Sequence, residues 1–114
     1  MAREIKESDW KLFRRLHPIT LERFCQRVIE EVGSATSSCV DGYHDCYLKL
    51  FALMRNRNRE MADTFDDPRR SNAFILLANI KELGLLSEEE LMQFSPGARE
   101  AIEVIDSIRE RTAL

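Results

Sequence analysis

The sequence lacks the features that several common protein classes require. Its four glycines stand far apart, and each is explained by a helix end or a turn, so no glycine-rich loop is available to hold a phosphate. The longest strongly apolar run, Phe74 to Ala78, is far below the roughly 20 residues that cross a bilayer. No alternating apolar and polar run flanked by turn residues predicts a β-strand. These absences favour an all-α protein that does not span a membrane.

Cysteine and histidine are also scarce. The three cysteines, Cys25, Cys39 and Cys46, leave one unpaired under any intramolecular pairing, so we expect reduced thiols rather than a disulfide framework. Cys39, His44 and Cys46 form the one cluster of metal-type side chains. A structural zinc site needs a second pair of ligands from elsewhere in the chain, and the sequence offers none. These three residues are therefore weak metal candidates, and we expect no metal or other cofactor.

No segment has a strong excess of charge. The chain carries 17 basic and 20 acidic residues, which gives a formal net charge of −3. The first eight residues alternate charged and small side chains, without the apolar run of a signal peptide, so we expect a cytoplasmic location. The length of 114 residues matches one domain, and residues 1–114 are expected to form a single all-helical domain.

What the sequence has in abundance is apolar residues at helical spacing. The pattern predicts a compact bundle of five or six helices around a long central helix at about residues 43–66. Before that helix, Pro18 interrupts an amphipathic segment and predicts either two helices or one bent helix. Gly33 is expected to end this segment before a loop of small polar residues. Within residues 47–54 the apolar side chains cover most of the circumference, which is typical of a helix packed on several sides.

Start and stop signals divide the second half of the chain into further helices. They predict a buried helix around residues 74–80, a short helix that ends near Phe94, and a last helix with a narrow apolar stripe. The signals are, in chain order, Asp67-Pro68 as a start, Gly84 as a stop, Ser87 with Glu90 as a capping box, and Ser95-Pro96 as the last start.

The sequence does not indicate a catalytic site. A thiol nucleophile drawn from Cys39 or Cys46 needs a nearby base and an oxyanion site, and neither can be located. No Gly-x-Ser-x-Gly elbow surrounds any serine. The acidic residues at 63–67 and 88–90 have ordinary roles at helix ends. We therefore do not favour an enzyme, and we assign no catalytic or cofactor-binding residues.

Arginines near the end of the long helix form the strongest basic cluster. Arg55, Arg59, Arg69 and Arg70 are candidates for binding an anion or a nucleic acid. Nearby acidic residues and an isoelectric point near 5.4 weaken this hypothesis. The alternative is a solvated helix end, so nucleic-acid binding is kept as the second hypothesis.

The leading hypothesis is that this small helical protein acts through protein–protein interaction, as a regulatory or adaptor protein that self-associates as a homodimer. A short apolar segment ahead of Pro18 could dock on another chain. The predicted partner-binding residues are Trp10, Phe13, Arg14 and Leu16, since tryptophan and arginine are common at the centres of interfaces. The alternative is that Trp10 covers the end of the protein's own core.

Overall fold

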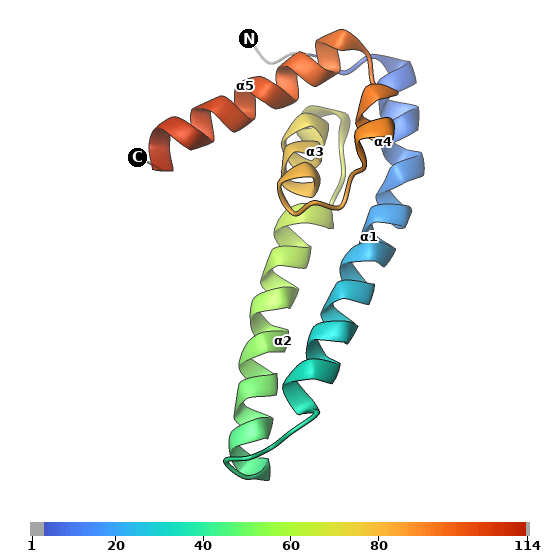
Figure 1. The fold of residues 1–114 in the computed structure, drawn as a ribbon. Helices are drawn as coiled ribbons and strands as arrows, with labels where there is room; N and C mark the ends of the chain where they lie inside the picture. Colours follow the sequence, from blue (N-terminus) through green and yellow to red (C-terminus); the bar gives the residue numbers. More distant parts are fainter. Residues whose placement is uncertain (1–3, 114) are drawn as a thin grey trace.

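The structure, a computed structural model, describes residues 4–113 and has no β-strand in that range, so the all-α prediction is confirmed. Helices α1 and α2 form an antiparallel hairpin, and the remaining helices gather at one end of it (Figure 1). The molecule measures 53 × 33 × 24 Å because the hairpin extends beyond the rest of the fold. The elements are α1 (Glu7–Thr36), α2 (Tyr43–Phe65), the 3-10 turn η1 (Arg70–Asn72), α3 (Ala73–Glu82), α4 (Glu88–Met92) and α5 (Pro96–Ala113).

Helix α1 runs without interruption through Pro18, which settles the two predicted alternatives in favour of one helix. Proline in a helix interior removes a hydrogen bond and costs about 3 kcal/mol. Two apolar side chains on either side of it, Phe13 and Phe24, are buried in the same core. Their burial favours one continuous element and offsets the cost of the proline. The helix also continues past Gly33, so the predicted stop there is wrong.

The core lies at the end of the hairpin where the N-terminal half of α1 and the C-terminal end of α2 meet α3, α4 and α5. Helix α5 is tied to α1 by Asp9, a buried carboxylate that accepts hydrogen bonds from the Ser95 backbone nitrogen at 2.9 Å and the Ser95 hydroxyl at 2.6 Å. The Ser95 hydroxyl in turn accepts from the backbone nitrogen of Ala98, so the predicted start of the last helix is confirmed. The largest fully buried side chains are Phe13, Phe94, Leu77, Ile80, Leu85 and Ile102.

The long helix is present almost as predicted, at Tyr43–Phe65, but its first half is not packed on several sides. Of its residues, Cys46, Thr64 and Phe65 are buried. The apolar side chains between them are largely exposed, because α3–α5 pack at the other end of the hairpin (Figure 1). The expectation of burial on all sides around residues 47–54 is therefore wrong.

Most of the predicted start and stop signals in the second half are confirmed. Gly84 ends α3 with a φ angle of 71°, a conformation that glycine adopts without strain. Ser87 and Glu90 form the predicted capping box at the start of α4. Asp67 does not cap a helix, since α3 begins six residues later, after η1. Within residues 4–113, no helix is both long and apolar enough to cross a membrane.

Candidate functional site

The predicted partner-binding face at the N-terminus is inside the core. The exposed fractions of Trp10, Phe13 and Leu16 are 8%, 0% and 5%, so a partner could not reach them in this fold. Arg14 alone of the four is exposed. The structure corrects this prediction and agrees with the alternative, in which Trp10 covers the core. The physical reason is that the segment continues as α1, which places its apolar face in the common core with α3.

The four candidate arginines do not form one free basic patch. Arg70 pairs with Glu7 at 3.1 Å and lies over the Trp10 ring, with 5.2 Å from guanidinium carbon to ring centroid. Arg69 contacts Asp67, and its hydrogen bond holds the pKa of that carboxyl below its ordinary value. Arg55 lies over the ring of Phe51 at 5.9 Å. Two of the four charges are thus already neutralised, which weakens the anion-binding hypothesis.

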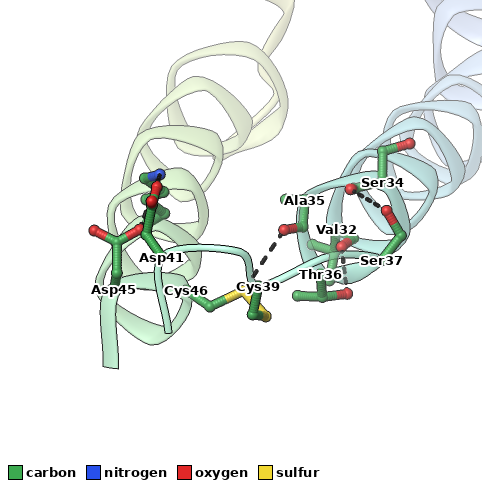
Figure 2. Close-up of a disulfide and its surroundings, with 10 residues drawn as sticks. Val32, Ser34, Ala35, Thr36, Ser37, Cys39, Asp41, Asp45 and Cys46 are labelled. Carbon is green, nitrogen blue, oxygen red and sulfur yellow. Dashed lines mark hydrogen bonds and ion pairs between the residues drawn. A yellow bond between two sulfur atoms is a disulfide. The ribbon is translucent and has the colours of Figure 1, made fainter. Parts of the chain in front are cut away.

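The proposed metal cluster contains a disulfide between Cys39 and Cys46, with a Cα–Cα distance of 5.5 Å (Figure 2). This corrects the expectation of reduced thiols and removes both sulfurs as zinc ligands. His44 is exposed. Among the described residues, no group of three or more His, Cys, Asp or Glu side chains could hold a metal ion. The bond joins the interhelical loop to the first turn of α2, and Cys25 is left as a free thiol.

Thiol titration tests the disulfide directly. We expect air-oxidised, denatured protein to show one reactive thiol, Cys25, and reduced protein to show three. Mass spectrometry of alkylated peptides would assign each label. Helix content should stay unchanged on reduction, since the bond closes only a short loop. Three reactive thiols in fresh protein without reductant would contradict the assignment.

A row of large apolar side chains lies exposed on the N-terminal half of α2, which extends away from α3–α5. Tyr43, Tyr47, Phe51 and Met54 follow one another at spacings of four, four and three residues, so they share one face of the helix. The exposed fractions of the first three are 88%, 64% and 58%. Leu48 flanks the row and is also half exposed. Isolated exposed apolar residues are common on protein surfaces, whereas a continuous row of this size is not.

Helix α1 contributes to the same side of the hairpin. Cys25, Ile29 and Val32 also share a helical face, on which Ile29 is 67% exposed and the other two are half-buried. On each helix the apolar row lies about a quarter-turn around the helix axis from the residues that contact the other helix. Counted along increasing residue number, this quarter-turn has the same direction on both helices. In an antiparallel pair of right-handed helices, that sense leads to one common side. We call this surface the hairpin face, made of Cys25, Ile29, Val32, Tyr43, Tyr47, Phe51 and Met54.

The opposite side of the hairpin is polar and partly covered. Arg57 of α2 pairs with Glu31 of α1 at 2.9 Å and with Glu60 at 2.8 Å. Its hydrogen bond lowers the pKa of Glu31. These three residues line a cavity of about 300 Å³ together with Arg27 and the end of α3. The charges on this side are mutually neutralised, so the cavity does not favour a charged ligand.

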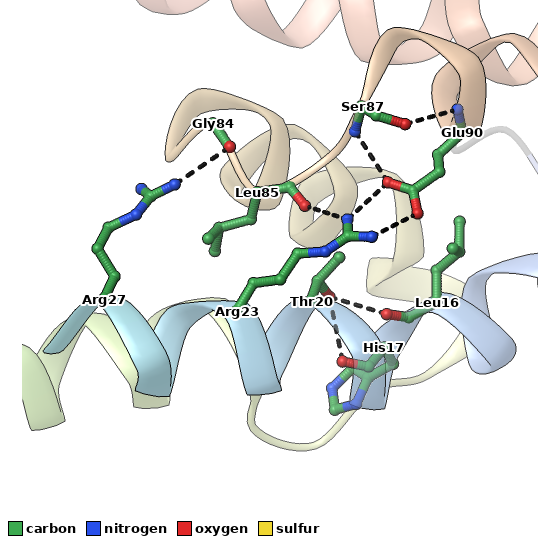
Figure 3. Close-up of polar contacts among 9 residues, drawn as sticks. All are labelled: Leu16, His17, Thr20, Arg23, Arg27, Gly84, Leu85, Ser87 and Glu90. Atoms are coloured by element: carbon green, nitrogen blue, oxygen red, sulfur yellow. Dashed lines mark hydrogen bonds and ion pairs between the residues drawn. The ribbon is translucent and has the colours of Figure 1, made fainter. Parts of the chain in front are cut away.

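Two arginines of α1 fasten this polar side to the α3–α4 junction (Figure 3). Arg23 bonds both carboxylate oxygens of Glu90, at 2.7 and 2.9 Å, and donates to the carbonyl of Leu85 at 2.8 Å. Arg27 donates to the carbonyls of Leu83 and Gly84. These bonds satisfy carbonyl groups left open at the end of α3. Helices α3 and α4 are thereby held on the side away from the hairpin face.

The Arg23–Glu90 pair predicts a loss of stability in acid. The hydrogen bond from Arg23, with bonds from Ser87, lowers the pKa of Glu90 from 4.5 to about 2. A carboxyl with a depressed pKa stabilises the fold above its unfolded value, and this contribution is lost as pH falls from about 4.5 toward about 2. At about 1.4 kcal/mol per pKa unit, the whole shift would correspond to a larger loss of stability. Because Arg23 is partly exposed, we expect a smaller loss, of about 2 kcal/mol.

Urea unfolding followed by circular dichroism, at fixed protein concentration across this pH range, measures that loss. The variant Glu90→Gln should show a flatter dependence on pH. Glu89→Gln is the matched control, because Glu89 is exposed and next in the chain, and it should behave as wild type. Equal pH dependence in wild type and Glu90→Gln would contradict the assignment.

Sequence reasoning missed the hairpin face because it assigned the same residues to the core. A signal was present: apolar side chains covered most of the circumference around residues 47–54, more than the contact with one antiparallel helix can bury. Comparison with protein-family models, with curated proteins and with solved structures finds no match.

Proposed function

We propose that this protein acts by binding a helical protein chain through the hairpin face. The observation that carries the proposal is the exposed row Tyr43, Tyr47 and Phe51, continued across the hairpin by Ile29. Burial of such side chains against a partner removes apolar surface from water, which is the main driving force of protein association. The regulatory or adaptor role and the cytoplasmic location expected from the sequence belong to this proposal.

The chemistry of the face fits a protein partner better than a small ligand. Aromatic residues, methionine and arginine are enriched at the centres of protein interfaces, and the face offers Tyr47, Phe51 and Met54 with Arg55 stacked beside them. The surface is a ridge of side chains on two helices rather than an enclosed cavity. A long pair of helices presents such a ridge most readily to other helices, by packing of side chains between side chains.

One observation argues against the cytoplasmic location. A disulfide such as Cys39–Cys46 is typical of an oxidising compartment. The thiol titration above therefore bears on the location as well, if it is repeated on protein alkylated inside the producing cells. Two additional reactive thiols in such cells would support a reducing compartment.

Site-specific crosslinking in cells tests the proposed function. A photoreactive amino acid placed at Phe51 should form a covalent adduct with another polypeptide. The same amino acid at Glu89, which is exposed on α4, is the control and should give none. If Phe51 yields no adduct at native expression level while the protein is folded, the face does not bind a protein chain and the proposal is wrong.

A further inference from the structure

We infer that the partner on the hairpin face is a second copy of this chain, with the two hairpins packed as a four-helix bundle about a two-fold axis parallel to them. The inference rests on the proposed function and names its occupant. Three features support it: the area of the face, the charges along its edges, and the position of the α3–α4 junction.

The three exposed aromatic side chains alone supply about half of the area that a stable dimer needs. A standard interface uses about 800 Å² from each partner. A fully buried aromatic side chain contributes about 150–250 Å², so Tyr43, Tyr47 and Phe51 at their exposed fractions offer on the order of 400 Å². Ile29, Met54 and the half-buried side chains between the helices add to this. Each copy would bring the same surface, as a two-fold interface requires.

The two edges of the face carry opposite charge. Along the outer edge of α1 lie Glu22, Gln26 and Glu30, one helical turn apart, and along the outer edge of α2 lie Arg55 and Arg59. Glu22, Glu30, Arg55 and Arg59 are exposed. A two-fold axis parallel to the hairpin places α1 of one copy beside α2 of the other. The acidic edge of each copy then lies beside the basic edge of its partner.

Glu30 matches the basic edge in height, whereas Glu22 lies about 12 Å further along α1. Arg57 pairs with Glu31 across the hairpin at 2.9 Å, so residues 30 and 31 lie level with the middle of the segment from Arg55 to Arg59. A rotation about an axis parallel to the helices changes no height along them. Glu30 of one copy therefore lies level with Arg55 and Arg59 of the other. In the alternative arrangement, with the axis perpendicular to the helices, like helices and like charges would face each other.

The α3–α4 junction does not obstruct this arrangement. Arg23 and Arg27 hold the α3–α4 junction on the opposite side of the hairpin. Neighbouring helices in the proposed bundle all run antiparallel, within each copy and between copies. This is the common arrangement of four-helix bundles.

Charge reversal with sedimentation velocity tests the inference on the full chain. Wild type should be a dimer across about 1–100 µM. Glu30→Lys, and separately Arg55→Glu with Arg59→Glu, should each weaken dimerisation at least about tenfold, because like charges then lie beside each other at both edges. An equimolar mixture of the two variants should form a heterodimer, and a chain with all three substitutions should dimerise again. Circular dichroism checks that each variant folds.

The outcomes separate this inference from the proposed function. Wild type that is monomeric at about 100 µM overturns the second-copy inference, and so does a dimer that is insensitive to all three charge reversals. If the Phe51 crosslink then joins a different protein, the proposed function stands without self-association. A monomer with no crosslink contradicts both. A crosslinked product of twice the chain mass, together with rescue in the mixture, supports both.

Discussion

Replacing Tyr47 and Phe51 together by glutamate is expected to convert the protein to a monomer that remains folded. Each side chain is more than half exposed in one copy, so a carboxylate there costs the fold little. In the bundle the same carboxylates would be buried among apolar side chains without a partner, which is strongly unfavourable. We expect the dissociation constant to rise at least about 100-fold, the range of two central interface residues.

Sedimentation velocity and thermal unfolding at matched concentration measure both parts of this expectation. The matched control is Ile75→Glu with Val104→Glu, since those two side chains are also about half exposed but lie on α3 and α5. The control should keep the wild-type dissociation constant. A control as disruptive as Tyr47→Glu with Phe51→Glu would show that exposed apolar side chains in general, and not the hairpin face, cause self-association.

Replacing Phe13 by alanine is expected to destabilise the fold by about 3–5 kcal/mol, the range for removal of a large buried side chain. Phe13 is completely buried, and its ring contacts those of Trp10 and His17, with centroid distances of 5.6 and 5.8 Å. The expected loss is a large part of the stability of a domain of this size. Urea unfolding followed by circular dichroism measures it.

A neighbouring substitution provides the control. Arg14→Ala changes an exposed side chain, and we expect its free energy of unfolding to stay within about 0.5 kcal/mol of wild type. If Phe13→Ala does not fold, Phe13→Leu should still fold with a loss of roughly 1–2 kcal/mol. Equal stability of the position-13 and position-14 variants would mean that the N-terminal segment is not part of the core and would restore its candidacy as a partner-binding face.

The helical class and many helix ends follow from local rules. Ser87 with Glu90 and Gly84 act where they were predicted, because a cap or a left-handed turn depends on residues within one helical turn. Gly33 and Pro18 show the limit of such rules. Helix α1 passes through both. At Pro18, burial of Phe13 and Phe24 in one core outweighs the local preference.

Which apolar residues lie inside was harder to predict than which segments are helical. Helical spacing shows that Trp10 and Phe13 share a face, and equally that Tyr47 and Phe51 do. It does not show which face meets the rest of the chain. The same limit applies to Cys39 and Cys46, whose pairing depends on how the interhelical loop returns to α2.

The sequence by itself determined an all-α chain with a long second helix and most of the start and stop signals after it, because these depend on spacing and on neighbouring residues. Only the tertiary structure decided that α3 and α4 pack on one side of α1 and leave the hairpin face open. The reason is that burial depends on contacts between residues distant in sequence: Arg23 with Glu90 and Asp9 with Ser95 place the last three helices at one end of the hairpin. The exposed row on α2 follows from that placement.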